Sequence, residues 1–388
     1  RYLANSVEQF FVNGGTRCYV TRVIPADAKK AAVKKGILSV TAVNEGKWGN
    51  RIQVTLTSVA KKKMQILGKN GDSYVAKSVD GFREGDLVTV DGEYNRIVSI
   101  YDNTVVFEKA FKKDIVDTAI VPKTVVYLAE TNISVRYNEE VENYVGVSFN
   151  TANPNYIGYK MANSDLVTIE ITPAKELMNP VEQILGKGNT SGMLLLEGGS
   201  NGSIGKINAA TFIGEDNGPG ARTGLAAFVE NTSVSMLAIP GVTMPEVIVA
   251  LVAQCENLKN RMAVIDMPKD LFKTKDLLEY REMIDSSYAA MYHPWIQVLD
   301  RASGKSDYIP PSGAVLGVYS RNDMTRGVHK APANETVFCT GLKTNYTSAE
   351  QDILNPAGVN LIRALPGQGI RVWGARTASS NSQFKYVN

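Results

Sequence analysis

The sequence has few residues that could build a metal or redox site. Among 388 residues there are only three cysteines and two histidines, and Cys18, Cys255 and Cys339 lie far apart without any Cys-x-x-Cys pair. Structural zinc sites need closely spaced cysteine and histidine ligands, so the sequence predicts no metal and no other cofactor. The same cysteine spacing favours a reducing compartment without structural disulfides.

The sequence also lacks a charge excess and a long apolar run. Lys and Arg together number 42 and Asp and Glu 39, a formal net charge of +3, and the basic residues are scattered. A nucleic-acid-binding protein instead gathers its cations on one face. No apolar run approaches the roughly 20 residues of a membrane-spanning helix, and the first residues show no signal-peptide pattern. We therefore expect neither nucleic acid nor membrane as a partner.

Length and composition favour a folded chain of more than one domain. At roughly 150 residues per domain, 388 residues correspond to two or three domains. A hydrophobic content of 44% and a charged content of 21% are ordinary for globular proteins. The chain begins at Arg1 inside an expected helix and ends, over 384–388, in a run typical of the start of a strand. We expect that both ends are cut.

The hydrophobic spacing changes twice along the chain. Helical spacing at Leu3, Val7 and Phe10 predicts a helix, and the run 18–24 predicts a strand. Over 26–172 the apolar residues alternate between turns, which predicts an all-β domain, a β-sandwich or small barrel. Its strands are expected at 37–43, 52–59, 87–90, 97–100, 105–107, 125–128 and 133–137.

Residues 173–388 have the pattern of an α/β domain. Short apolar runs that suit buried strands alternate with candidate helices, which predicts a mostly parallel sheet covered on both faces. Residues 1–25 fit this domain better than the β-rich segment, so we interpret 26–172 as an insertion. The expected strands are 193–196, 234–239, 262–266, 296–299, 359–362 and 370–373, and the expected helices are 224–230, 246–259, 270–287 and 348–354.

One motif resembles the nucleophile elbow of a serine hydrolase. Gly198-Gly199-Ser200-Asn201-Gly202 satisfies G-x-S-x-G and follows an apolar run. The elbow also needs a helix directly after the serine, but the glycine-rich continuation disfavours one. Asp266 or Asp323 and His329 would have to complete the triad. A flexible loop explains the same letters, so hydrolysis at Ser200 stays the alternative function. No phosphate or dinucleotide loop is complete.

Two further features have competing interpretations. His293 precedes Pro294 and Trp295 at a strand entrance, where a packed histidine is more common than a catalytic one. The basic segment 326–334 is either a surface loop or a contact with an acidic partner. Groups of like charge such as Lys61-Lys62-Lys63 and Glu139-Glu140 are typical of solvated surface.

Several segments, in order along nearly the whole chain, resemble contractile tail sheath proteins of bacteriophages, R-type bacteriocins and related injection systems. Trp48-Gly49-Asn50 resembles the family's entry into an inserted β domain, and Leu196 with the following Gly198–Gly202 loop resembles a family loop, which accounts for the hydrolase-like letters. The other similar segments are 10–15, 19–23, 239–241, 263–268, 292–295, 310–317, 326–334, 359–360 and 372–377.

The resemblance implies a structural protein and not an enzyme. It implies a subtilisin-like α/β core carrying the inserted β domain, and subunits that stack as helical hexameric rings around a tail tube. Contraction would drive the tube through the target cell envelope. The implied partners are other sheath subunits, the tail tube, the baseplate and the tail terminator. The implied location is the virion tail, after assembly in the bacterial host cytoplasm.

The resemblance also implies where contacts lie and what this chain lacks. Family subunits are linked by terminal arms that add strands to neighbouring sheets, and the arm regions are absent here, so we expect a largely monomeric, assembly-deficient fragment. The candidate contacts with neighbouring subunits or the tube are Arg326, His329, Lys330, Asn334, Asn360 and Arg376.

Overall fold

The computed structural model describes residues 2–116, 125–173, 176–301 and 303–387. The chain divides into two compact units. Unit 1 consists of Arg1–Val23 and Ile207–Asn388, and unit 2 is the continuous segment Ile24–Lys206 between them.

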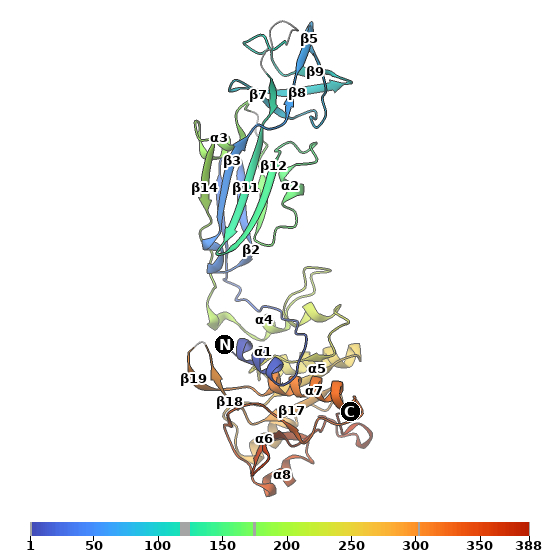
Figure 1. Ribbon diagram of the computed structural model, residues 1–388. Helices are drawn as coiled ribbons and strands as arrows, with labels where there is room; N and C mark the ends of the chain where they lie inside the picture. The colour runs from blue at the N-terminus through green and yellow to red at the C-terminus, as the bar shows by residue number, and fades with distance from the viewer. Residues whose placement is uncertain (1, 117–124, 174–175, 302, 388) are drawn as a thin grey trace. The chain divides into compact units, whose positions relative to one another are not determined.

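Unit 2 contains a body in which two antiparallel sheets share one apolar core. One sheet has the order β1-β2-β13. The other has the order β12-β11-β3-β14 (Figure 1). Val40, Leu56 and Ile133 belong to the core between them and are almost completely buried. The elements are β1 (Lys30–Lys35), β2 (Leu38–Glu45), η1 (Lys47–Arg51), β3 (Gln53–Val59), β11 (Glu130–Tyr137), β12 (Glu140–Val147), α2 (Ile157–Lys160), β13 (Val167–Ile171), α3 (Pro180–Leu185), β14 (Ser191–Leu195) and η2 (Ile204–Lys206).

A second antiparallel sheet system in unit 2 has its own core. Its strand order is β4-β10-β7-β8-β9-β6-β5, and Val88, Ile97 and Val105 are buried in its core. The hairpin turns after β7 and β8 place Asp91 and Asp102 at positive φ, as expected for tight turns. The strands are β4 (Lys63–Met64), β5 (Ile66–Asn70), β6 (Ser73–Ala76), β7 (Leu87–Val90), β8 (Glu93–Tyr101), β9 (Thr104–Phe107) and β10 (Val126–Leu128).

The structure corrects the expected end of the inserted segment. Residues 173–206 belong to unit 2 and not to the α/β unit, because β14 pairs antiparallel with β3, with Met193 opposite Thr55. The apolar run around Met193 predicts a strand correctly, but local sequence does not tell which sheet a short strand joins.

Unit 1 is an α/β unit built on a six-stranded mixed sheet. β15-β16-β17-β22 are parallel, and β23 and β20 complete the sheet antiparallel. The elements are α1 (Leu3–Val12), α4 (Ala209–Ile213), η3 (Gly224–Phe228), β15 (Met236–Leu237), α5 (Pro245–Leu258), β16 (Met262–Asp266), α6 (Thr274–Arg281), β17 (Ala289–His293), β18 (Ile296–Asp300), β19 (Lys305–Ile309), α7 (Ser312–Arg326), β20 (Glu335–Thr336), β21 (Gly341–Leu342), α8 (Ser348–Leu354), β22 (Val359–Leu365), β23 (Gly369–Val372) and η4 (Ser382–Phe384).

Both faces of this sheet are covered. Alternate residues of a strand point to opposite faces, and the alternate residues of β16 and β17 enter two different cores. Ile265 and Met291 pack in one core with α5, and Val264 and Tyr292 pack in the other with α7. The central strands are therefore apolar on both sides, as in parallel sheets generally.

Helix α1 packs closely along α7 through two glycines. A Cβ at Gly313 would lie 2.3 Å from the backbone oxygen of Ser6, and one at Gly317 would lie 2.3 Å from that of Phe10. Both contacts join residues 307 positions apart, so the two helices run parallel. The glycines thus allow a backbone-to-backbone approach that any side chain would block.

Four expected elements of unit 1 differ from the structure, and the first is the expected helix 224–230, which is the 3-10 helix η3. The run 18–24 forms no strand, although every residue in it is described, because a β-rich run needs a neighbouring strand. The expected helix 270–287 is shorter, since α6 ends at Arg281 and β17 follows. The expected strand 296–299 is β18, but it joins the separate antiparallel sheet β19-β18-β21. Among the described residues, no helix is long and apolar enough to cross a membrane.

Candidate functional site

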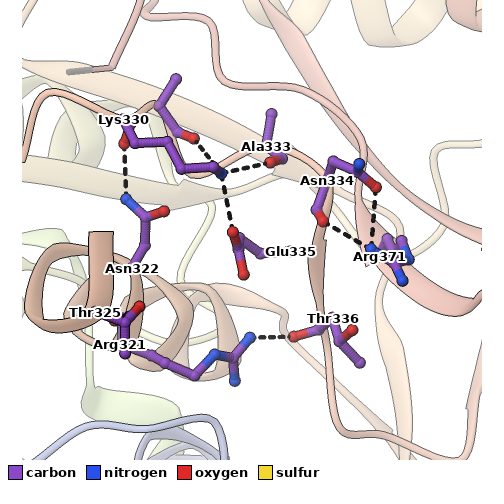
Figure 2. Close-up of polar contacts among 10 residues, drawn as sticks. Arg321, Asn322, Thr325, Lys330, Ala333, Asn334, Glu335, Thr336 and Arg371 are labelled. Atoms are coloured by element: carbon purple, nitrogen blue, oxygen red, sulfur yellow. Dashed lines mark hydrogen bonds and ion pairs between the residues drawn. The ribbon is translucent and has the colours of Figure 1, made fainter. Parts of the chain in front are cut away.

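The segment 326–334 is a loop folded around the ammonium group of Lys330. The loop begins at Gly327, which ends α7 with a φ of 91°. Lys330 Nζ donates to the backbone oxygens of Ala331 and Ala333, each at 3.0 Å, and lies 2.9 Å from Glu335 Oε1 (Figure 2). The ammonium group of Lys330 therefore donates to its own loop and to the adjacent strand β20.

Residues outside the loop hold its middle and its C-terminal end. Asn322 Nδ2 donates to the backbone oxygen of Lys330 at 2.7 Å, and Arg371 Nη1 donates to the backbone oxygen of Asn334 at 2.9 Å. Arg321 joins α7 to β20 by donating to the backbone oxygen of Thr336 (Figure 2). It also joins α7 to the end of α1 by donating to the backbone oxygen of Asn13. Sequence patterns did not single out Asn322, Arg321 or Arg371, because an isolated polar residue in a helix or strand carries no signal of its tertiary partner.

The exposed side chains of this loop are mainly basic and polar, with one apolar residue. Arg326, His329 and Asn334 are exposed, and the side chain of Val328 is 69% exposed. Among these, Asn334 has a left-handed backbone, at a φ of 60°, that places it at the start of β20. The loop is thus a preordered surface that could contact a partner without further folding.

Asn360 and Arg376 form a second group, linked through the backbone. Asn360 Nδ2 donates to the backbone oxygens of Met291 and Arg376, at 3.1 and 2.7 Å, and Asn360 Oδ1 accepts from the backbone N–H of Arg376 at 2.6 Å. The amide thereby substitutes for a strand in pairing with the segment after β23. Because Asn360 is 0% exposed, the expectation that it contacts a neighbouring subunit is wrong for this conformation.

Arg376 lies at the base of a hairpin formed by the last described residues. Its guanidinium stacks on the ring of Tyr386 at 4.5 Å from the ring centroid, and Val387 N donates to the backbone oxygen of Ala375 at 3.0 Å. Arg376 is half-buried, while Tyr386 is 55% exposed. This hairpin and not Asn360 is the surface that the second group offers.

The hydrolase-like motif does not have the geometry of a nucleophile elbow. Ser200 Oγ accepts a local hydrogen bond from Gly202 N at 3.2 Å, and the next element is the single 3-10 turn η2 and not an α-helix. Asp266, the expected acid, accepts from Ser312 N and Oγ, each at 2.8 Å, and from Gly241 N at 3.1 Å. Its carboxylate is thus used at the N-terminus of α7, and not to orient a histidine.

Buried titratable groups lie at the carboxyl ends of the parallel strands. Burial raises the pKa of Asp266, at the end of β16, to about 6, although its hydrogen bonds from Gly241 and Ser312 oppose the shift. Burial lowers the pKa of His293, at the end of β17, to about 4. Within the described residues no group of three or more His, Cys, Asp or Glu side chains is placed to hold a metal ion.

A cavity of about 180 Å³ lies beside β15 in unit 1. Leu3 and Val7 of α1, the extended residues Tyr19 and Val20, and Met236 of β15 are among the residues that line it. β15 is an end strand of its sheet, and the edge that faces away from β16 pairs with no strand in the part of the chain that the structure describes. The free edge of β15 and the exposed segment that contains Tyr19 and Val20 therefore both border the cavity.

Part of unit 1 is similar to a family of phage tail proteins. Residues 214–378, all within unit 1, match the family model described as the phage tail sheath protein central domain. The resemblance of the sequence to tail sheath proteins is thereby confirmed.

Individual relatives fit the same class. The chain is 25% identical over 194 residues to a putative prophage major tail sheath protein of Pseudomonas aeruginosa strain UCBPP-PA14, covering 47% of this chain and 49% of the relative. It is 27% identical over 195 residues to the tail sheath protein of Escherichia phage P2, covering 46% and 47%. The chain spans about half the length of these relatives. Among solved structures, the contracted helical sheath of the anti-feeding prophage matches at 26% identity with a TM-score of 0.34, covering 42% of this chain and 44% of that one.

Proposed function

We propose that the chain is part of a sheath subunit that polymerises as stacked helical hexameric rings around a tail tube and contracts to drive the tube through a cell envelope. The match of residues 214–378 to the sheath central domain carries this proposal. Unit 1 is then the sheath core, with a subtilisin-like topology, and unit 2 is the insertion that it carries. The subunit acts as a structural protein of the virion tail, without catalysis, after assembly in the host cytoplasm.

The mechanism needs an interface that repeats without closing on itself. A head-to-tail contact of this kind generates an open helical array from identical subunits. A second, lower-energy packing of the same subunits then supplies the work of contraction, and a kinetic barrier preserves the extended state. No chemical fuel is consumed.

Two features of unit 1 suit such contacts. The loop 326–334 presents Arg326 and His329 in a preordered shape, which fits an acidic surface on the tail tube or on a neighbouring subunit. The open edge of β15 and the exposed run around Tyr19 could each pair with a strand donated by a neighbour. The baseplate and the tail terminator would contact the two ends of the same array.

Charge reversal tests the contact surface. Arg326→Glu combined with His329→Glu in the complete gene product should weaken tube formation, because both side chains are exposed and neither is used inside the loop. Lys330 is unsuitable, since reversing its charge would disturb the loop itself. The matched control reverses Lys34 and Lys35, which are exposed on β1 of unit 2. Tubes that form as in the unmodified protein would remove this loop from the interface.

A further inference from the structure

The loop whose letters resemble an active-site motif is held by a pair of asparagines. Asn50 Oδ1 accepts from Gly199 N at 2.7 Å, and Asn50 Nδ2 donates to the backbone oxygen of Gly199 at 3.0 Å. Asn201 Oδ1 accepts from Lys47 N at 2.9 Å. The segment 47–50 is thus bonded to the segment 199–201 through side-chain amides, although the two are about 150 residues apart in the chain.

The glycines of the motif are required by close contact. A Cβ at Gly199 would lie 2.5 Å from the backbone oxygen of Gly46, and one at Gly202 would lie 2.8 Å from Ala28 N. Gly202 also has a φ of 69°, where residues with a Cβ are strained. The Gly-Gly-Ser-Asn-Gly sequence is therefore explained by packing of one backbone against another, and not by an oxyanion site.

The same contacts tie together the two chain crossings between the units. The chain passes from unit 1 to unit 2 after Val23 and returns after Lys206. Just inside unit 2, Lys29 and Ser200 exchange two backbone hydrogen bonds of 2.9 Å. Asp27 Oδ1 accepts from Ser203 N at 3.0 Å, and Asp27 Oδ2 lies 3.7 Å from Lys206 Nζ. The chain segment that enters unit 2 and the segment that leaves it are therefore joined by hydrogen bonds within a few residues of the boundary.

Apart from the exposed ion pair of Lys206 with Asp27, few contacts hold the returning chain after Ser203. Ile204 is 85% exposed, and no atom lies within 4 Å of the position of a Cβ on Gly205. Residues 203–206 are all exposed. Local stability increases with the number of buried contacts. The backbone of 204–207 should therefore open more easily than the cross-linked segment before it.

We propose that Asn50, Asn201 and Asp27 form a neck clasp, which makes the two crossings one connection and leaves the weakly held residues 204–207 as the place where the returning connection bends. A flexible chain of four residues has a root-mean-square span of about 11 Å, and one of ten residues about 18 Å. Loss of the clasp would leave 197–206 held only by the backbone bonds of Ser200 with Lys29 and of Glu197 with Ala32. When this weakened segment opens, the returning connection lengthens in this way. Motion of unit 2 relative to unit 1 would then widen.

Hydrogen exchange tests the clasp directly. Asn50→Ala should speed exchange of the backbone N–H groups of 197–206 on the order of tenfold, because Gly199 loses both of its bonds to the amide. Peptides from β3 and β11 should exchange as in the unmodified protein, since Asn50 is exposed and its removal leaves no core cavity. Asn143→Ala, at an exposed position on β12, is the matched control and should change nothing in 197–206.

Two results would overturn the proposal. Unchanged exchange in 197–206 would show that the amide contacts do not hold the loop. Faster exchange across all of unit 2 would show that Asn50 supports the fold and not a clasp. Asp27→Asn gives an independent reading, because it weakens only the link to Ser203 and Lys206 and should speed exchange in 202–206.

A distance measurement tests the consequence for the units. Spin labels at Val249→Cys on α5 and Asn143→Cys on β12, in a background with Cys18→Ser and Cys339→Ser, report the spread of distances between unit 1 and unit 2. Pulsed electron paramagnetic resonance should give a broader distribution when Asn50→Ala and Asn201→Ala are added. Equal widths with and without the clasp variants would contradict the hinge assignment, whatever the protein assembles into.

Discussion

The buried histidine at the end of β17 should make unit 1 lose stability in acid. His293 is 1% exposed, and its ring packs edge-on against Tyr346 with the ring centroids 5.7 Å apart. Burial and then the positive charge of Lys343 lower the pKa of His293 from 6.5 to about 4, although the backbone of Leu271 opposes the shift. The folded chain therefore keeps this imidazole neutral at a pH where the unfolded chain protonates it.

The size of the effect follows from that difference in pKa. Between about pH 6.5 and pH 4 the unfolded state binds a proton that the folded state does not, so the free energy of unfolding falls as the pH is lowered. A difference of about 2.5 pKa units, at about 1.4 kcal/mol per unit, amounts to about 3 kcal/mol at pH 4. Above pH 7 the protonation of His293 no longer affects the free energy of unfolding.

Urea unfolding at several pH values measures this contribution. Trp295 and Trp373 report on unit 1, and Trp48→Phe removes the tryptophan of unit 2. His293→Gln cannot be protonated, so the stability gap between it and the unmodified protein should shift by about 3 kcal/mol between pH 7.5 and pH 4. His329→Gln changes the other histidine, which is exposed, and is the matched control variant. A gap for His293→Gln that is constant across this range would refute the reasoning.

Three further outcomes follow from individual contacts in unit 1. Gly317→Ala should destabilise unit 1 by about 1–3 kcal/mol in urea unfolding, because its Cβ would lie 2.3 Å from the backbone oxygen of Phe10; Gly205→Ala meets no atom within 4 Å and should be neutral. Asn360→Ala should release the hairpin 375–387 and speed its hydrogen exchange while β16 stays protected; an unchanged hairpin would contradict its assigned role. Asp266 has a folded pKa of about 6, above its ordinary 3.8, so its contribution to stability is lost as the pH rises through 6. Asp266→Asn should therefore gain stability relative to the unmodified protein between pH 4 and pH 7, and a constant difference would disprove this.

The fold was predictable where the sequence signal is local. The strand 262–266 and the helix 348–354 agree with β16 and α8, since an apolar run and a helix-capping threonine are readable in sequence. Helix α7 was not predicted, because Gly313 and Gly317 disfavour a helix and only the contact with α1 explains them. β17 has the composition of a helix, but its five residues are buried on both faces.

The candidate sites were also predictable only where the sequence signal is local. The segment 326–334 was selected correctly as a loop, yet the partners of Lys330 depend on Asn322 and Glu335 from neighbouring elements, which spacing does not reveal. The G-x-S-x-G letters were misleading because a motif specifies residue types and not their contacts. Only the structure brings Asn50 to Gly199 and turns that motif into a packing feature.

The most direct test of the sheath assignment is negative-stain electron microscopy of the complete gene product that contains this chain. The account predicts hollow, regularly striated tubes or stacked rings, and shorter or fewer tubes when Arg326→Glu and His329→Glu are introduced. Dispersed particles from the complete gene product, under conditions where it remains folded, would contradict the claim that this chain is part of a polymerising sheath subunit.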